Sequence, residues 1–333
     1  MKPLSRKFRR GLFWGLFAVF VVGTPILIGY SQGYRLDDAL ELIQTGGIYI
    51  HSDLANTNVF LNGEFVEDNG VLIRNTLIQD LTPNRSYELW VEKEGLQSWV
   101  KILRVQPNLV TEARVFMLPE TLEWETIPAT STLRIAGTVT TASTSASSTT
   151  VVANPAHVEL QTFFTSSRDQ FEVEIATTTY TYVGAVRVAT TTILREIQFP
   201  GWLETLASTS ALSDKTMVRE RDGVVAWLDN GNIHATWART DEAAPYFFCN
   251  TTATCTPEFL IDWEEPIERY NFYPNRNDVV LVSTNRGLFA IELDNRSQRN
   301  IQVVSDTPSL DFRIDTNDVL ITFDGTVFKT TSW

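Results

Sequence analysis

Two stretches of the sequence are dense in carboxylates, the side chains used in acid–base catalysis and in calcium binding. They are DWEEPIE, from Asp262 to Glu268, and DFRIDTND, from Asp311 to Asp318. A glycoside hydrolase needs two carboxylates that face each other across a cleft, and a calcium ion needs several oxygen ligands. Both stretches have the composition of strand ends and turns. The sequence therefore predicts solvated turns, with a weak calcium site and a hydrolytic site as the alternatives.

Other catalytic and metal-binding patterns give little support to an enzyme. The three histidines are far apart in the sequence, and no HExxH, paired CxxC or EF-hand pattern occurs. His51 and Ser52 are neighbours, and neighbouring residues of a strand point to opposite faces, which is wrong for a Ser–His catalytic pair. We therefore predict that the protein is not an enzyme and has no catalytic residue, cofactor or metal site.

The two cysteines, Cys249 and Cys255, are separated by five residues in a polar, threonine-rich segment. A zinc site needs two further ligands nearby, and the surrounding sequence offers none. We predict a disulfide that closes the tip of a hairpin, which requires a compartment outside the cytoplasm. Two free thiols without a role are the alternative.

Residues 11–30 contain no charged side chain and are long enough, as a helix, to cross the hydrocarbon core of a bilayer. Arg9 and Arg10 precede this segment, and Trp14 and Tyr30 lie near its two ends, where interfacial aromatic residues belong. The basic tail places the N-terminus in the cytoplasm and the bulk of the chain outside. We therefore predict a single-pass cell-membrane protein that contacts the lipid bilayer through this helix.

A cleaved signal peptide is the alternative to an anchor. Its apolar region usually spans about 7–15 residues and ends in small residues of the AxA kind. The apolar run is longer here, and the following GTPILIGYSQG has no clear cleavage site. The sequence therefore favours an uncleaved anchor.

The chain of 333 residues has a formal net charge of -13, although its first ten residues carry five basic side chains and no acidic one. The remainder is therefore strongly acidic. Because nucleic-acid binding depends on basic surfaces that contact phosphate, we predict no nucleic-acid partner. The acidity is explained by solubility.

Helical spacing gives way to β periodicity after the apolar segment. Leu36, Leu40 and Ile43 share one stripe of YRLDDALELIQTGG, which predicts a short juxtamembrane helix within residues 31–45. From Ile48 the period changes to two, in six or seven short runs separated by Asn-Gly and Thr-Pro-Asn turn signals. This pattern predicts a small antiparallel β-sandwich.

Four short motifs follow one another within residues 46–119. A Gly-x-hydrophobic strand is followed by a hydrophobic-x-Asn-Gly turn, a Leu-x-Pro approach to a strand, and a turn that leads to a tryptophan. Together they resemble a PEGA domain, although SDLANTN replaces the name-giving Pro-Glu-Gly-Ala turn. The resemblance implies a surface-exposed β module of the bacterial cell envelope without catalytic residues. The matching positions are Gly47, Ile48, Ile50 and Ser52; Val59, Leu61, Asn62 and Gly63; Leu81, Pro83 and Tyr87; and Gly95, Leu96 and Trp99.

Two tryptophans in YELWVEKEGLQSWV receive different interpretations. The resemblance makes Trp99 a scaffold position that packs in the core or on a sheet. Trp90 alternates with Leu89 and Val91 and therefore falls on the charged side of its strand. It either packs against another segment of this chain or contacts a partner, and Trp90 is our candidate partner-contact residue.

The middle of the chain changes character. Residues 137–152 are rich in Thr, Ser and Ala without a hydrophobic period, which predicts a mobile linker or long loop. HVELQTFF and WLETLASTSAL suggest short helices. The segment FEVEIATTTYTYVGAVRVATTTILREI alternates well enough for two strands.

One pattern recurs three times near the C-terminus, in segments that start at Arg221, Arg276 and Thr316. Each has an Asx turn, an apolar strand, a tight polar turn and a second strand, as in β-propeller blades. IERYNFYPN and SLDFRID are expected to form inner strands, and RNIQVV an outer strand. Because the length suffices for only about four or five blades, we predict a partial or degraded propeller, with a β-sandwich of repeated hairpins as the alternative.

The predicted fold is therefore mainly β, with an N-terminal transmembrane helix, a small antiparallel PEGA-like sandwich and a larger domain that resembles a partial propeller. The predicted parts are a cytoplasmic basic tail at 1–10, a transmembrane helix at 11–30, a juxtamembrane helix at 31–45, a PEGA-like sandwich at 46–119, a mixed region at 120–215 and propeller-like repeats at 216–333.

This architecture predicts an anchored, extracytoplasmic, non-enzymatic module for binding, adhesion or envelope organisation, with an envelope protein or glycan as partner. One alternative is a ligand-sensing or hydrolytic ectodomain with its site in the propeller-like region. Another is a membrane subunit of a secretion or pilus machine.

Overall fold

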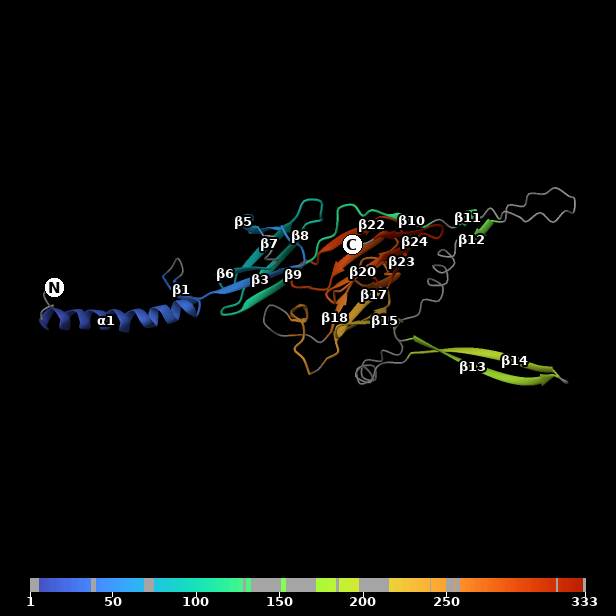
Figure 1. Cartoon of the computed structure of the whole chain (residues 1–333), viewed down its shortest axis with the longest axis horizontal. Helices are drawn as coiled ribbons and strands as arrows, with labels where there is room; N and C mark the ends of the chain where they lie inside the picture. The colour runs from blue at the N-terminus through green and yellow to red at the C-terminus, as the bar shows by residue number, and fades with distance from the viewer. Residues whose placement is uncertain are drawn as a thin grey trace, which may run out of the picture. The chain divides into compact units, whose positions relative to one another are not determined.

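The computed structural model is mainly β and divides into two units (Figure 1). Unit 1 comprises Met1–Met117 with Arg296–Gln298, and unit 2 comprises Leu118–Asn295 with Arg299–Trp333. The first boundary lies close to the predicted one at 119. The structure describes residues 6–36, 40–68, 75–127, 130–132, 151–153, 172–183, 186–197, 216–239, 241–249, 255, 258–315 and 317–331.

Unit 1 begins with helix α1, Arg6–Ser31, which contains the apolar segment and Pro25. Its 26 residues extend over about 39 Å at the helical rise. None of its side chains is buried, and it is long and apolar enough to cross a membrane. The helix starts at Arg6, before the apolar segment, so the basic residues Arg9 and Arg10 belong to the same helix.

The predicted juxtamembrane helix is wrong. The segment forms an antiparallel hairpin of β1, Tyr34–Leu36, and β2, Leu42–Gln44. Gly33 has a positive φ of 80°, which ends the helical path, and its carbonyl accepts hydrogen bonds from Thr45. The apolar stripe has no core to pack against here, and a short helix without tertiary packing is marginal in water.

The remaining described residues of unit 1 form two sheets. In each sheet one face is buried, as expected for a small sandwich, although the β3–β9 pair is parallel. The first sheet has the order β6-β3-β9, with β3 Gly46–Ser52, β6 Asn75–Leu81 and β9 Val110–Val115. The second has the order β5-β4-β7-β8, with β4 Asn58–Leu61, β5 Glu64–Asp68, β7 Ser86–Glu92 and β8 Trp99–Arg104.

Two glycine-containing sites explain the local geometry of these sheets. Asn62 and Gly63 both have positive φ and join β4 to β5, which is the backbone of a type I′ hairpin turn. A Cβ on Gly46 would approach the carbonyl oxygen of Gln106 closely, so that β3 requires glycine at this position. The core contains Ile48, Ile50, Val59, Leu89, Val91, Trp99 and Leu103.

The described residues of unit 2 include three four-stranded antiparallel sheets. The first has the order β15-β16-β17-β18, with β15 Thr216–Arg221, β16 Val224–Asp229, β17 Asn232–Trp237 and β18 Glu258–Ile261. The second has the order β19-β20-β21-β22, with β19 Arg269–Phe272, β20 Val279–Thr284, β21 Gly287–Glu292 and β22 Ile301–Ser305. The third has the order β10-β25-β24-β23, with β10 Glu125–Ile127, β23 Asp311–Ile314, β24 Leu320–Phe323 and β25 Phe328–Thr331.

The predicted threefold repeat is confirmed at the level of these sheets. Its three copies form the hairpins β16–β17, β20–β21 and β24–β25. The predicted inner strands are β19 and β23, the predicted outer strand is β22, and β19 lies beside both β15 and β23. The described part of the chain supplies three such sheets rather than a closed propeller.

In the middle region, the described residues form two antiparallel strand pairs. β11, Thr130–Thr132, pairs with β12, Val151–Ala153. β13, Glu172–Val183, pairs with β14, Val186–Ile197, which confirms the two predicted strands. The two suggested short helices and nearly all of the predicted linker at 137–152 lie outside the described residues.

Candidate functional site

The outer face of the sheet β5-β4-β7-β8 carries a row of apolar side chains around Trp90. The strand register places Phe60, Trp90 and Val100 opposite one another on β4, β7 and β8. Phe65 on β5 extends the row, and its ring meets that of Phe60 edge-on at 5.7 Å between centroids. Ile102 lies two residues beyond Val100 on the same face. We call Phe60, Phe65, Trp90, Val100 and Ile102 the Trp90 face.

Most of this face is open to solvent. Trp90 is 43% exposed, Ile102 50% and Phe65 58%. The alternation of β7 requires this, because Leu89 and Val91 are fully buried on the other side. Glu88 and Arg104 are exposed on the same strands and supply a charged rim. A rigid sheet that presents aromatic and branched apolar side chains inside a charged rim is suited to binding another surface.

Trp99 has the opposite environment. It faces the core from β8 and is fully buried, which agrees with its predicted scaffold position. The turn before it contains Gly95, with a φ of 77°. The two tryptophans of one hairpin therefore separate into a core residue and a surface residue.

The acidic stretches lie in strand ends and turns, as predicted. DWEEPIE connects β18 to β19, and DFRIDTND covers β23 and the turn after it. Asp311 pairs with Arg269 at 2.7 Å between Oδ1 and Nε, and Glu268 accepts a hydrogen bond of 2.9 Å from Ser309. Among the described residues, no group of three or more His, Cys, Asp or Glu side chains is placed to hold a metal ion.

Two turn carboxylates have lowered pKa values. Burial opposes ionisation of Asp315, but hydrogen bonds from the backbone N–H groups of Val319 and Asn317 and from the Asn317 side chain outweigh it and lower its pKa. The Thr326 hydroxyl, followed by the backbone N–H groups of Val327 and Thr326, lowers the pKa of Asp324. Both carboxylates act as turn caps.

We therefore expect acid to weaken unit 2 through these turns. Because the folded-state pKa values lie below the unfolded value of about 4, the stabilisation is present above that pH and is lost as the pH falls through the folded values. The variant D315N/D324N should lose less stability than the parent between neutral and acidic pH, as measured by urea denaturation. Equal pH dependence of the two proteins would contradict the assignment.

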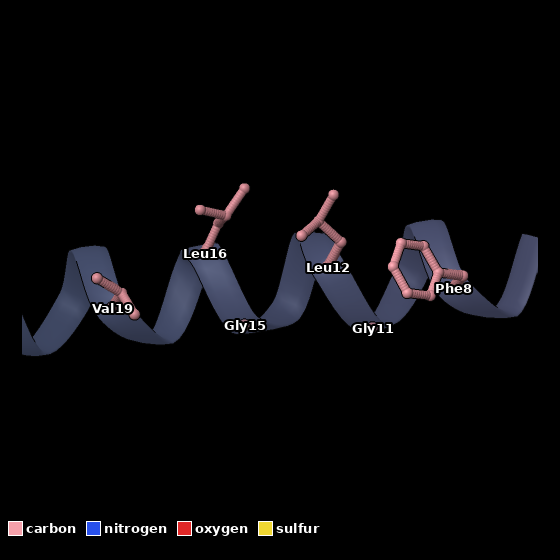
Figure 2. Close-up of a pocket in the computed structure, with 6 residues that line it drawn as sticks. All are labelled: Phe8, Gly11, Leu12, Gly15, Leu16 and Val19. Carbon is pink, nitrogen blue, oxygen red and sulfur yellow. The ribbon is translucent and has the colours of Figure 1, made fainter. Parts of the chain in front are cut away.

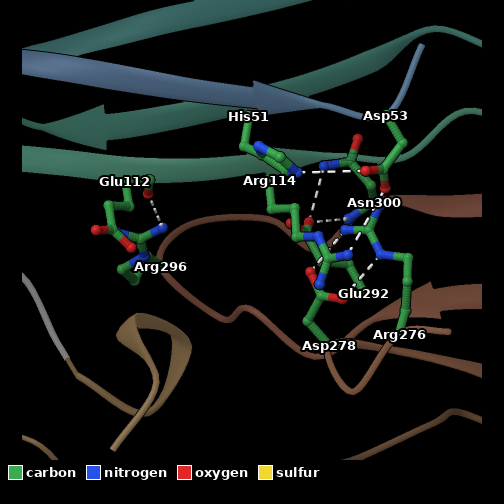
Figure 3. A network of polar contacts seen from close by, with 9 residues as sticks. All are labelled: His51, Asp53, Glu112, Arg114, Arg276, Asp278, Glu292, Arg296 and Asn300. Carbon is green, nitrogen blue, oxygen red and sulfur yellow. Dashed lines mark hydrogen bonds and ion pairs between the residues drawn. The ribbon is translucent and has the colours of Figure 1, made fainter. Parts of the chain in front are cut away.

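Unit 2 also contains a buried polar cluster at one end of the sheet β19-β20-β21-β22 (Figure 3). Arg276 and Asp278, which are 5% and 1% exposed, form a bidentate pair at 2.8 and 2.6 Å just before β20. Glu292, at the end of β21, accepts a 2.9 Å hydrogen bond from the Asn300 side chain. Asp294 is 1% exposed. The sequence patterns did not single out this cluster.

The pKa values of two neighbouring residues, Tyr246 and Arg299, depend partly on the charges of the cluster. Burial of its hydroxyl raises the pKa of Tyr246 well above its ordinary value, and the carboxylates of Asp278, Asp294 and Glu292 add to the shift. Burial lowers the pKa of Arg299, while Asp294 and Glu292 oppose that change. The bonds between Arg276 and Asp278 and between Asn300 and Glu292 join members of the cluster to one another.

Within unit 1, His51 and Ser52 do not form a catalytic pair. The His51 Nε2 atom lies 3.2 Å from Asp53 Oδ1 (Figure 3), whereas Ser52 is buried and bonds to the backbone of Leu54. The side chains therefore occupy different environments, as the strand alternation predicts. Figure 3 also shows Arg296 donating to the carbonyl oxygen of Glu112, at 2.6 Å.

Cys249 and Cys255 form the predicted disulfide. Their backbones face each other as an antiparallel bridge, between the short 3-10 helix Tyr246–Phe248 and β18. Phe247 and Phe248 on that helix are buried in the core of unit 2. The disulfide therefore closes a loop that is fixed to the core on its N-terminal side.

Reduction should destabilise unit 2 by about 2 kcal/mol, because the loop that the disulfide closes is short. The measurement is the thermal unfolding transition of the purified protein with and without reductant, compared with C249S/C255S. The double variant should match the reduced parent and be insensitive to reductant. A parent transition that reductant leaves unchanged would show that the closed loop contributes nothing to stability.

The predicted anchor residues all lie on α1. Trp14 contacts Phe17 edge-on at 5.6 Å, and Tyr30 lies under the guanidinium of Arg35, 3.6 Å from its ring centroid. Arg9 and Arg10 lie in the first two turns.

One face of α1 is hollowed (Figure 2), because Gly11 and Gly15 have no side chains between flanking apolar residues. Small residues four positions apart let membrane helices approach closely, but two glycines alone do not identify a partner.

Comparison of the chain with protein-family models gives no match, and no curated protein matches the sequence.

Proposed function

We propose that this protein is a single-pass membrane protein of the cell envelope whose β units form an extracytoplasmic, non-enzymatic binding module. Its partner is an envelope protein that docks on the Trp90 face. The exposed aromatic row of that face is the observation that carries the proposal.

Two features support the membrane anchor and the compartment. Residues 11–30 of α1 carry no charged side chain and have no buried face, and basic residues precede them on the same helix. The positive-inside rule then directs the rest of the chain out of the cytoplasm. The disulfide between Cys249 and Cys255 agrees with this direction, because disulfides persist in oxidising compartments.

The side chains of the Trp90 face favour a protein over a glycan. Phe65, Phe60, Trp90 and Val100 form a continuous apolar row across four strands, which is wider than a single stacking platform. Aromatic and apolar side chains at the centre with charges at the rim are typical of protein interfaces. The resemblance of unit 1 to a PEGA domain and of the unit 2 sheets to propeller blades supports an envelope binding protein.

Site-specific photo-crosslinking tests the proposal. A photoreactive benzophenone amino acid at Val100 in the full-length protein should give one discrete adduct with another protein in native membranes. The adduct should be lost when Trp90→Ala is added. The same group at Leu260, which is 42% exposed on β18 of unit 2, is the matched control.

Three outcomes would overturn the proposal. The first is an adduct at Val100 that does not depend on Trp90 or is equalled at Leu260. The second is Trp90-dependent retention on envelope glycan, which would replace the protein partner. The third is hydrolytic activity that is lost in Asp311→Asn, which would replace the binding function by an enzymatic one.

A further inference from the structure

Exposed leucines gather where α1 meets the β1–β2 hairpin. Leu36, Leu40 and Leu42 are 64%, 79% and 68% exposed. Leu36 and Leu42 line an open apolar pocket with a volume of about 620 Å³, together with Pro25, Ile26 and Tyr30 of the helix. Apolar side chains this exposed in a hairpin indicate that something other than water covers them.

The helix fixes the depth of this surface relative to a membrane. If the charge-free residues 11–30 span the hydrocarbon core, Tyr30 lies at its outer boundary. Pro25 and Ile26 then lie about 6–8 Å deeper, at the helical rise per residue. Because Leu36 and Leu42 share one pocket with Pro25 and Ile26, the hairpin folds back along the helix toward the bilayer.

Arg35 holds the hairpin in this position. Its guanidinium stacks on Tyr30 and donates a 2.8 Å hydrogen bond to the Tyr30 carbonyl oxygen. It also pairs at 2.8 Å with Asp80 at the end of β6. The hairpin is therefore tied both to the helix and to the first sheet of unit 1.

A second group of apolar side chains lies at the same end of unit 1. Leu77, Leu109 and Val110 are 45%, 50% and 54% exposed. They line a neighbouring concave surface together with residues 30–33, which end the helix. This end of the first sheet therefore presents exposed apolar side chains among polar ones such as Gln79, Asp80 and Asn108.

We propose that the β1–β2 hairpin is an interfacial element that lies in the headgroup region of the outer leaflet and covers a phospholipid acyl chain in the pocket beside α1. This inference rests on the proposed membrane anchor. The sequence between the helix and β2 contains the carboxylates Asp37, Asp38 and Glu41, which are costly to bury in hydrocarbon, so the hairpin lies among the headgroups rather than deeper. The leucines contribute the apolar area that binds lipid, and Arg35, through Asp80, keeps the first sheet of unit 1 at a fixed height above the bilayer.

Spin-label accessibility in phospholipid nanodiscs tests the inference on the full chain. The variants Leu40→Cys and Leu42→Cys each provide one labelling site, because Cys249 and Cys255 are joined in the disulfide. Val19→Cys on α1 reports the anchor, and Leu260→Cys in unit 2 reports exposure to water. The expected result is several-fold lower accessibility to a water-soluble nickel relaxant at Leu40 and Leu42 than at Leu260, with oxygen accessibility raised toward that at Val19.

Comparing the label at Val19 with the labels at Leu40 and Leu42 separates a failure of the interfacial hairpin from a failure of the membrane anchor on which it rests. Protection at Val19 with Leu40 and Leu42 as accessible as Leu260 would overturn the interfacial hairpin and leave the anchor intact. Full aqueous accessibility at Val19 would overturn the anchor and the hairpin together. Because two hairpin positions are labelled separately, a local disturbance by one label does not decide the result.

Discussion

Asp278→Ala is expected to lower the free energy of unfolding of unit 2 by about 3–5 kcal/mol, the usual effect of breaking a buried ion pair. Asp278 is 1% exposed and accepts two hydrogen bonds from the Arg276 guanidinium. Its removal leaves a positive charge inside the sheet end without its bidentate partner. Desolvation of that charge, rather than the loss of attraction, accounts for most of the expected effect.

Two further variants separate the attraction between the paired charges from the cost of removing them from water. Arg276→Met combined with Asp278→Leu should recover part of the lost stability, because an apolar pair carries no desolvation penalty. The exposed pair of Arg239 and Glu242, at 3.3 Å, is the control, and Glu242→Ala should cost about 1 kcal/mol or less.

Urea denaturation of the full chain in detergent, with separate analysis of the unit 2 transition, measures all of these variants. Equal losses at Asp278 and Glu242 would show that the Arg276 pair contributes no more than a surface pair.

Trp99→Ala is expected to destabilise unit 1 by about 3–5 kcal/mol, because a fully buried indole leaves a large cavity. Trp99 is 0% exposed and faces a core that includes Leu89, Val91 and Leu103. Urea denaturation of unit 1 should show the loss in the transition midpoint. Trp99→Phe should cost much less, since within the described residues the Trp99 Nε1 atom has no hydrogen-bond partner and most of the apolar volume is retained.

Trp90→Ala is the matched control from the same hairpin. Trp90 is 43% exposed, so its truncation removes only cross-strand contact with Phe60 and Val100, expected to be about 1 kcal/mol or less. This small stability effect is what makes Trp90→Ala usable in the crosslinking experiment. A loss at Trp90 as large as that at Trp99 would mean that the Trp90 face is part of the core.

The sequence pattern was sufficient to predict the structure wherever the alternation of residues within one strand decides which side chains are buried. The separation of Trp90 from Trp99, the Asn62–Gly63 turn and the repeated hairpins of unit 2 are all encoded within a few residues. The short separation of Cys249 and Cys255 made the disulfide predictable in the same way. In each case, neighbours in the sequence supply the deciding contacts.

Features that depend on distant contacts were missed. The juxtamembrane leucines have helical spacing, but Arg35 stacking on Tyr30 and pairing with Asp80 selects a hairpin instead. The cluster around Arg276 joins residues from the β19–β20 connection with residues from the end of β21 and the β21–β22 connection, and its charged residues resemble ordinary turn residues in the sequence. The parallel pairing of β3 with β9 also joins segments about sixty residues apart, and no local periodicity specifies it.

The pairing of β10 with β25 has a consequence for how the protein is made. β10 occupies residues 125–127, yet the strand beside it, Phe328–Thr331, is synthesised about two hundred residues later. β10 therefore has no hydrogen-bonding neighbour in β25 until about two hundred intervening residues have been translated. If α1 is an anchor, the intervening residues must be exported before this pair can form. The third sheet of unit 2 is then completed only when β25 reaches the far side of the membrane.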